Sequence, residues 1–107
     1  MHTISRIDIH EAKDMIDAGQ ASIVDIRDAA SFQEAHIEGA VLLNDENVND
    51  FIEKVDKNKP LICYCYHGHS SQSAAQYFHL NGFAKVYSID GGLEEWRSAY
   101  PVRSNTN

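Results

Sequence analysis

The stretch that decides the fold reads LICYCYHGHSS and spans residues 61–71. Its first five residues, which end at Cys65, are an apolar run of the length expected for a buried strand. A loop of small and polar residues follows, and the apolar positions within residues 74–78 are spaced as on the buried face of a helix. The sequence therefore predicts a strand, a short loop and a helix in direct succession, with Ser70 or Ser71 as the helix cap.

The same alternation continues on both sides of this stretch. Apolar runs predict strands at residues 21–26, 40–43, 61–65 and 86–89. Amphipathic spacing and capping residues predict helices at residues 8–19, 28–35, 48–55, 70–81 and 93–100. Strands that alternate with helices predict a three-layer α/β fold, in which a four- to five-stranded, mainly parallel sheet carries helices on both faces.

Length and charge narrow the class of protein further. The 107 residues suit one domain, which we expect to span residues 1–107, with a frayed polar tail at 102–107. The formal net charge of -7 argues against nucleic acid or an anionic membrane surface as a partner. An anionic ligand would therefore need a local site built from backbone N–H groups or a helix N-terminus.

The cysteines and the chain's amino-terminal residues bear on the compartment. Cys63 and Cys65 stand one residue apart, and a disulfide ring this tight is sterically disfavoured. No apolar run is long enough to span a bilayer, and residues 1–6 lack the apolar core of a signal peptide. We therefore expect a cytoplasmic protein with reduced cysteines.

Cys65 has the setting of a nucleophile. At the carboxyl end of its strand it faces the start of the next helix, where free N–H groups and a partial positive charge lower the pKa of a thiol. Gly68 allows a tight loop in which successive N–H groups point inward. Such a nest can hold a thiolate, a persulfide or an oxyanion without any Lys or Arg. Cys63, within the apolar strand, is better explained as a small core residue.

Two loop histidines, His67 and His69, raise the question of a metal. With Cys65 they would give three ligands within five residues and no distant fourth, which fits a tetrahedral zinc site poorly. We therefore expect no metal and no cofactor. The histidines are assigned to the walls of the loop, with an inert exposed position as an equal alternative for His69. Ser70 and Ser71 each have two candidate roles that do not exclude each other, hydroxyl donor to the sulfur and helix cap.

The chain resembles the rhodanese family at three of that family's sequence motifs. The loop CYHGHS, residues 65–70, is similar to that family's six-residue active-site loop, which begins with the sulfur-carrying cysteine. The segments VDIRD and HIEGA, residues 24–28 and 36–40, resemble its amino-terminal signature, and VYSIDGGLEEW, residues 86–96, resembles its carboxy-terminal one. The segments occur in the family's order and cover nearly the whole chain. The loop and the helix after it most resemble the one-domain, GlpE-type thiosulfate sulfurtransferases.

The resemblance implies a ping-pong sulfurtransferase. Cys65 would take the outer sulfur of thiosulfate, release sulfite, and pass the sulfur from its persulfide to cyanide or a thiol, including a thioredoxin-like dithiol protein. The N–H groups of residues 66–71, from Tyr66 onward, would stabilise the negative charge on sulfur. Arg27 has two candidate roles: an ion pair with Asp25, or a contact to the sulfite end of the substrate.

The position after the cysteine departs from the family's pattern. Many rhodaneses carry Arg or Lys there, whereas this chain has Tyr66 followed by His67. Because the loop is almost uncharged at neutral pH, the sequence predicts weak affinity for thiosulfate and a high Michaelis constant.

Three other functions compete with that of a thiosulfate-using enzyme. A cysteine phosphatase or arsenate reductase needs Cys-x5-Arg, but the sixth residue after Cys65 is Ser71 and the sixth after Cys63 is His69. A non-catalytic rhodanese-like module usually lacks the cysteine that this chain retains. A sulfur-relay protein shares the persulfide chemistry and delivers the sulfur to a specific protein partner; the sequence does not separate it from a small-molecule enzyme.

Overall fold

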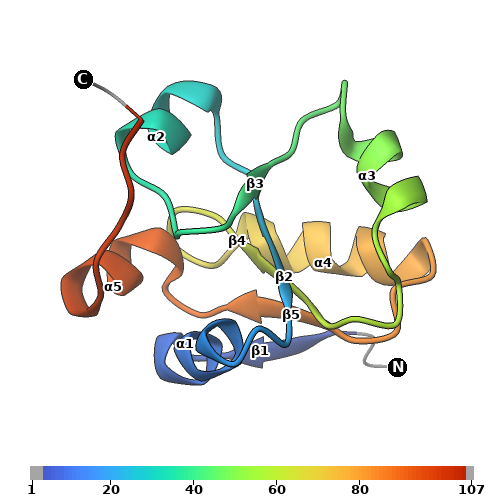
Figure 1. Cartoon of the computed structure of the whole chain (residues 1–107), viewed down its shortest axis with the longest axis horizontal. Helices are drawn as coiled ribbons and strands as arrows, with labels where there is room; N and C mark the ends of the chain where they lie inside the picture. The colour runs from blue at the N-terminus through green and yellow to red at the C-terminus, as the bar shows by residue number, and fades with distance from the viewer. Residues whose placement is uncertain (1–3, 106–107) are drawn as a thin grey trace.

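The computed structural model describes residues 4–105, which form a parallel sheet covered by helices on both faces (Figure 1). The strands lie in the order β1-β5-β4-β2-β3, and every neighbouring pair is parallel. Their bounds are β1 Ser5–Ile7, β2 Ser22–Asp25, β3 Val41–Leu42, β4 Leu61–Tyr64 and β5 Val86–Ile89. The helices are α1 Ile9–Asp17, α2 Ala29–Glu34, α3 Val48–Lys54, α4 Ser70–Leu80 and α5 Gly92–Ala99. The predicted α/β fold is thereby confirmed.

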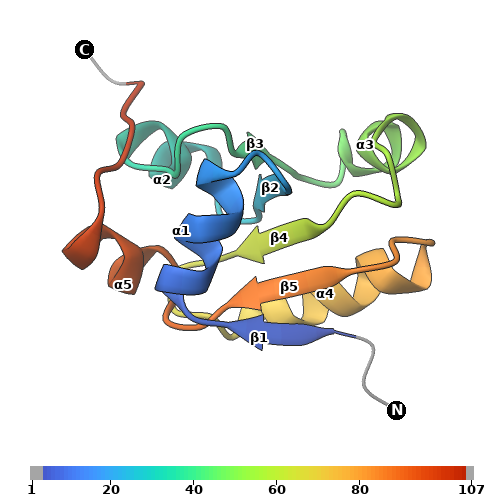
Figure 2. The same ribbon diagram turned by 60° about the horizontal axis from the view of Figure 1, so that its bottom comes forward.

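The sheet separates two apolar clusters. One contains residues of α1 and α5, and the other contains residues of α3 and α4, so that α1 lies in front of the sheet and α4 behind it in Figure 2. Strand β4 supplies both clusters, because Ile62 and Tyr64 belong to the first and Leu61 and Cys63 to the second. A central strand buried on both faces reads as an unbroken apolar run, and this explains why the sequence pattern of β4 was so clear.

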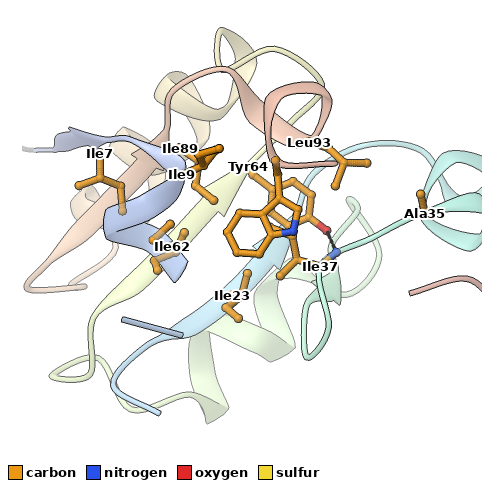
Figure 3. Close-up of a cluster of buried hydrophobic side chains, with 11 residues drawn as sticks. Ile7, Ile9, Ile23, Ala35, Ile37, Ile62, Tyr64, Ile89 and Leu93 are labelled. Atoms are coloured by element: carbon orange, nitrogen blue, oxygen red, sulfur yellow. Dashed lines mark hydrogen bonds between the residues drawn. The ribbon is translucent and has the colours of Figure 1, made fainter. Parts of the chain in front are cut away.

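The first cluster joins the sheet to the loop that leads into β3 (Figure 3). The Tyr64 hydroxyl reaches out of the cluster and accepts a hydrogen bond from the backbone N–H of Ile37 at 3.1 Å. A fully buried tyrosine needs a polar partner for its hydroxyl, and this contact supplies one. Tyr64 thus ties the last residue of β4 to residues that precede β3.

Two predicted helix starts are confirmed at atomic detail. Asp8 caps α1 by accepting from the N–H of Glu11, whose side chain accepts in return from the N–H of Asp8. Asp28 caps α2 by accepting from the N–H of Ser31. Strand β1 was not predicted individually: it has three residues, of which two are exposed, and it exists because residues 5–7 pair with β5.

The described part of the carboxy-terminal tail differs from the expectation of fraying. Arg103 pairs antiparallel with His36, with N–H to oxygen distances of 2.9 and 2.8 Å, and its guanidinium contacts Glu38 at 2.9 Å. The N–H of Asn105 donates to the carbonyl of Gln33 at 2.8 Å. These contacts join residues far apart in the sequence, so no local periodicity signals them. Residues 106 and 107 of the predicted tail lie outside the described residues.

None of the helices within residues 4–105 has the length and apolar character needed to cross a membrane.

Candidate active site at the start of helix α4

Cys65 lies at the carboxyl end of the central strand of the sheet. Strand β4 ends at Tyr64, and α4 begins at Ser70, so that residues 65–69 form the connecting loop. The first turn of α5 supports this loop from behind. The N–H of Leu93 donates to the carbonyl of Cys65 at 2.9 Å, and the N–H of Glu94 donates to the carbonyl of Tyr66 at 3.0 Å. The loop is therefore held by the N-terminal donors of one helix while it leads into another.

Two glycines make this close packing possible. Gly92 has φ +58°, and a Cβ there would stand 2.5 Å from the carbonyl oxygens of both Cys65 and Tyr66. Gly68 has φ +92°, and a Cβ there would stand 2.9 Å from the backbone nitrogen of Gly91. Both positions combine a left-handed backbone with close contact to another segment, so only glycine fits without displacing its neighbours.

The sulfur of Cys65 sits in a cradle of hydrogen-bond donors. The N–H groups of Gly68 and Ser71 both donate to Sγ at 3.2 Å, and the Ser71 hydroxyl lies 3.4 Å from it. Cys65 is only 5% exposed, and its burial opposes a negative charge. Hydrogen bonds from the Ser71 hydroxyl and from the N–H groups of Ser71, Gly68 and His67 outweigh the burial and lower the pKa of Cys65 below its ordinary value. The site favours the thiolate, which is the nucleophilic form.

Cys63 has the opposite environment. It is fully buried among apolar side chains on the α4 face of the sheet, and burial raises the pKa of its thiol far above the ordinary value. Both cysteines are free, as the sequence predicted. The two thiols are thus separated in reactivity by their surroundings alone.

We expect this difference to be measurable by alkylation. The depressed pKa of Cys65 keeps it ionised below the pH at which an ordinary thiol loses its proton, about 8.5. Its rate of reaction with iodoacetamide will therefore reach half its maximum below that pH. Cys63 will react only after unfolding. A pH series of alkylation rates, with peptide mapping of the modified residue, tests both statements; a midpoint at or above that of a free thiol would contradict the cradle's effect.

The predicted serine cap of α4 is not formed. His69 occupies the N-cap position and makes no side-chain capping bond. Ser71 is fully buried, and both its N–H and its hydroxyl contact the sulfur, while Ser70 is exposed. The hydroxyl of Ser71 also lies 2.7 Å from the hydroxyl of Ser88 on β5. The role of hydroxyl donor therefore falls to Ser71, because helix geometry turns it, and not Ser70, toward Cys65.

Tyr66 fastens the loop to helix α2. Its hydroxyl donates to a carboxylate oxygen of Asp28 at 2.5 Å and also contacts the hydroxyl of Ser31. The hydrogen bond from Tyr66, followed by those from Ser31, lowers the pKa of Asp28 to about 2. Position 66, where many rhodaneses carry Arg or Lys, is thus occupied by a tyrosine whose hydroxyl is bonded to an ionised carboxylate. No sequence motif signalled this contact, which spans 38 residues.

Arg27 is buried in an ion pair with Asp25. Its side chain is 2% exposed, with guanidinium to carboxylate distances down to 2.6 Å and a further bond to the carbonyl of Ala35. Burial opposes the charge, but the bonds and charge of Asp25 outweigh it and raise the pKa of Arg27. The guanidinium also lies over the rings of Tyr64 and Tyr66, at 5.6 and 5.3 Å from their centres. Of the two roles expected for Arg27, this geometry supplies the ion pair, and it leaves the guanidinium engaged away from solvent.

The loop histidines His67 and His69 are exposed. Within residues 4–105 no three His, Cys, Asp or Glu side chains gather as a metal site would require. Gly68 is buried, and its carbonyl accepts from the side chain of Gln72 at 2.8 Å. The structure therefore gathers the cradle from Cys65, Gly68 and Ser71, with Tyr66 as its tether and the histidines on its outer surface.

Ser88 is the residue of this site that the sequence analysis missed. Its only signal was a polar side chain in the otherwise apolar run VYSI of β5. A fully buried serine at the centre of a sheet needs a hydrogen-bond partner, and it finds one in Ser71.

A low-pKa cysteine in an N–H cradle, at the carboxyl end of a parallel strand, defines an α/β protein built for cysteine-centred covalent chemistry. Residues 8–99 match the rhodanese-like domain family. Thiosulfate sulfurtransferase GlpE of Pseudomonas savastanoi pv. phaseolicola is 48% identical over 101 residues, covering 94% of each chain. GlpE of Stutzerimonas stutzeri is 52% identical over 101 residues, covering 94% of this chain and 92% of that protein.

A solved structure agrees at the level of the fold. The rhodanese-like domain protein of Staphylococcus aureus superposes with a TM-score of 0.81 at 21% identity, over 96% of this chain and all of that one. The chain belongs to the rhodanese family, and the resemblance seen at three sequence motifs is confirmed.

Proposed function

We propose that this protein is a thiosulfate sulfurtransferase in which Cys65 carries the transferred sulfur as a persulfide. The observation that carries the proposal is the cradle of Cys65, whose sulfur accepts N–H bonds from Gly68 and Ser71 at 3.2 Å each. The two GlpE relatives described above bear the name of this activity. Their identity over almost the whole chain supports the same chemistry here.

The first half-reaction loads the enzyme. The Cys65 thiolate attacks the outer sulfur of thiosulfate, the new S–S bond forms as the bond to the sulfite sulfur breaks, and sulfite leaves with the electron pair. The product is a Cys65 persulfide anion, and no external oxidant or reductant takes part. Covalent capture of this kind divides one difficult transfer into two easier ones.

The second half-reaction transfers the outer sulfur from the Cys65 persulfide to an acceptor. A nucleophilic acceptor attacks the outer persulfide sulfur, and Cys65 leaves as the thiolate with which the cycle began. Cyanide yields thiocyanate, and a thiol yields a new persulfide. In both half-reactions negative charge moves on and off the cysteine sulfur, so donors fixed at 3.2 Å from Sγ stabilise the leaving thiolate without rearranging. Arg27 and Tyr66 act as supports of the loop in this account, because their polar groups bind Asp25 and Asp28.

The site suits small-molecule donors and also a protein acceptor. The side chains of Tyr66, His67, His69 and Ser70 are exposed around the buried sulfur, so an incoming loop that carries a thiol would meet them first. A thioredoxin-like dithiol would discharge the persulfide, be oxidised to its disulfide, and release the outer sulfur as hydrogen sulfide. Two free cysteines and a mechanism that needs a thiolate support a reducing compartment, such as the cytoplasm, as the setting of this function.

Steady-state kinetics test the proposal directly. We expect thiocyanate to form from thiosulfate and cyanide, with double-reciprocal plots at several cyanide concentrations that run parallel. Parallel lines follow from a ping-pong cycle, because sulfite leaves before cyanide enters. Lines that intersect would require both substrates to bind together and would contradict a free persulfide intermediate. Absence of thiocyanate would remove thiosulfate:cyanide transfer as the function.

Tyr66→Arg should improve the apparent affinity for thiosulfate. The loop lacks a cation, and Asp28 adds a negative charge at the same corner of the site. A guanidinium at position 66 would attract the dianion and lower KM by roughly three- to tenfold at low ionic strength, with most of the gain lost in high salt. Initial rates over a thiosulfate series at two salt concentrations measure this effect.

The matched controls separate charge from shape. Tyr66→Gln removes the phenol without adding a charge and should not lower KM. Because Asp28 would partly neutralise the new arginine, Tyr66→Arg combined with Asp28→Asn should give the larger gain, and Asn still caps a helix well. A KM that is insensitive to the arginine in both backgrounds would show that charge does not limit binding.

A further inference from the structure

A buried pair of serines lies behind the reactive sulfur. The Ser71 hydroxyl stands 2.7 Å from the Ser88 hydroxyl and 3.4 Å from the sulfur of Cys65, and neither serine is exposed. Ser88 pairs with Cys63 in the β4–β5 register, on the sheet face covered by α4, and that face is otherwise apolar. Hydroxyls in such surroundings are costly to leave unpaired, so each depends on the other.

The count of protons determines which way this pair points. A serine hydroxyl has one proton to donate and two lone pairs with which to accept. Within residues 4–105, the hydroxyl of Ser71 is the only hydrogen-bond partner of the hydroxyl of Ser88. The buried Ser88 proton is therefore satisfied only when Ser88 donates to Ser71. In that arrangement the single proton of Ser71 is released from the pair and is free to point at the sulfur.

A thiolate makes this orientation compulsory. Ionised Cys65 has no proton, so the contact of 3.4 Å with Ser71 is a hydrogen bond only if Ser71 is the donor. The contact of 2.7 Å between the serines then survives only if Ser88 donates to Ser71. Donation by Ser88 also polarises the Ser71 hydroxyl and strengthens its bond to an anion.

We propose that Ser88 is a positioning residue of this active site, which donates to Ser71 and thereby turns the Ser71 hydroxyl proton toward the sulfur of Cys65. It acts through Ser71 and touches neither substrate nor sulfur. Its effect is to give the thiolate an oxygen-borne donor beside the two amide donors of the cradle. This role rests on the function proposed for Cys65 as nucleophile, and it adds a residue from β5 to a cradle otherwise built by the loop after β4 and the first turn of α4.

The proposal is tested by measuring the ionisation of Cys65. The measurement is the rate of iodoacetamide alkylation as a function of pH in a Cys63→Ala background, where Cys65 is the only thiol. Ser88→Ala should move the midpoint upward and slow alkylation at pH values below it by roughly two- to tenfold, the range expected for the loss of one ordinary hydrogen bond, because Ser88 acts on the anion only through Ser71. Ser71→Ala should slow it by at least as much. The double variant Ser71→Ala/Ser88→Ala should match Ser71→Ala, because Ser88 has no effect without Ser71.

A second pair of variants controls for packing. Ser88→Thr retains the hydroxyl and should keep the midpoint near that of the wild type. Ser88→Val has nearly the same shape as the threonine variant but no hydroxyl, and it should shift the midpoint upward. Charged and titratable neighbours of the loop are the same in all variants and cancel in the comparison: Arg27, Asp28, His67, His69, Asp90 and Glu94. Thermal unfolding of each variant establishes that the folded protein is being compared.

The outcomes are distinct. An unchanged midpoint in Ser88→Ala, an equal shift in Thr and Val, or an effect of Ser88→Ala that persists when Ser71 is already alanine would overturn the proposal and leave Ser88 a packing residue. Alkylation requires no sulfur donor, so these results do not depend on thiosulfate being the substrate. Failure of the proposed function would appear separately, as absence of thiocyanate from a protein with a normal Cys65 midpoint.

Discussion

Cys65→Ser should lower kcat/KM for thiocyanate formation by roughly 10³-fold or more, the scale on which enzymes lose activity when their nucleophile is removed. A serine hydroxyl at this position could occupy the same cradle, but it cannot form a persulfide, so the covalent route is closed. The effect should appear without loss of folding, because Cys65 lies in a loop and the substitution keeps its shape. Initial rates with thiosulfate and cyanide, beside a thermal melt, measure both quantities.

Cys63→Ala is the matched control. Its thiol is fully buried, its pKa is raised by burial, and its sulfur belongs to the apolar cluster beneath α4. The variant should keep kcat/KM within about threefold of the wild type and lose about 1 kcal/mol of stability through the smaller side chain. Equal losses of activity in the two variants would mean that the cysteines act together or that the nucleophile has been misassigned.

Gly92→Ala should be the most damaging single-methyl change in the active-site region. Its Cβ would stand 2.5 Å from two backbone carbonyl oxygens of the loop, so α5 must move away and break the bonds of 2.9 and 3.0 Å that hold Cys65 and Tyr66. A left-handed backbone with a side chain costs about 1–2 kcal/mol, and overpacking adds about 1–3 kcal/mol. We expect a loss of about 2–5 kcal/mol in unfolding free energy, with a large fall in activity in the protein that remains folded.

Gly19→Ala isolates the backbone contribution. Gly19 also has a left-handed backbone, at φ +68°, but no atom lies within 4 Å of the position a Cβ would take. It should lose only the strain of about 1–2 kcal/mol and retain full activity. Urea unfolding curves and initial rates for the two variants give the comparison. If Gly92→Ala proved as mild as Gly19→Ala, the support of the loop by α5 would not be needed for its shape.

The parts of this fold that sequence could predict are those determined by local patterns. Strand β4 is a run buried on both faces, α1 carries a complete capping box, and each produces a signal within a few neighbouring residues. The same holds for the proposed nucleophile, because the succession of strand, loop and helix places Cys65 before a helix N-terminus wherever that succession occurs. The local sequence pattern around Cys65 and its position in the fold both put the thiol at a helix N-terminus, and for this reason the sequence could predict a specific residue.

What sequence could not predict depends on contacts between distant segments. The bond from Tyr66 to Asp28 spans 38 residues, and that between Ser71 and Ser88 spans 17. The ordered tail exists because Arg103 meets His36 and Glu38 across the fold. None of these pairings can be predicted from the spacing of residues along the sequence. Ser71 shows the point most clearly, since the sequence pattern allows both a helix cap and a hydroxyl donor to the sulfur, and only the fold selects the second.

The central claim is that thiosulfate leaves one sulfur atom on Cys65, and intact mass spectrometry of the purified protein after brief incubation with thiosulfate tests it most directly. We predict that the wild type and Cys63→Ala gain the mass of one sulfur, that peptide mapping places it on Cys65, and that cyanide removes it with formation of an equal amount of thiocyanate. Cys65→Ser should gain nothing. A wild-type protein that stays at its original mass, or a Cys65→Ser variant that still takes up sulfur, would contradict the account.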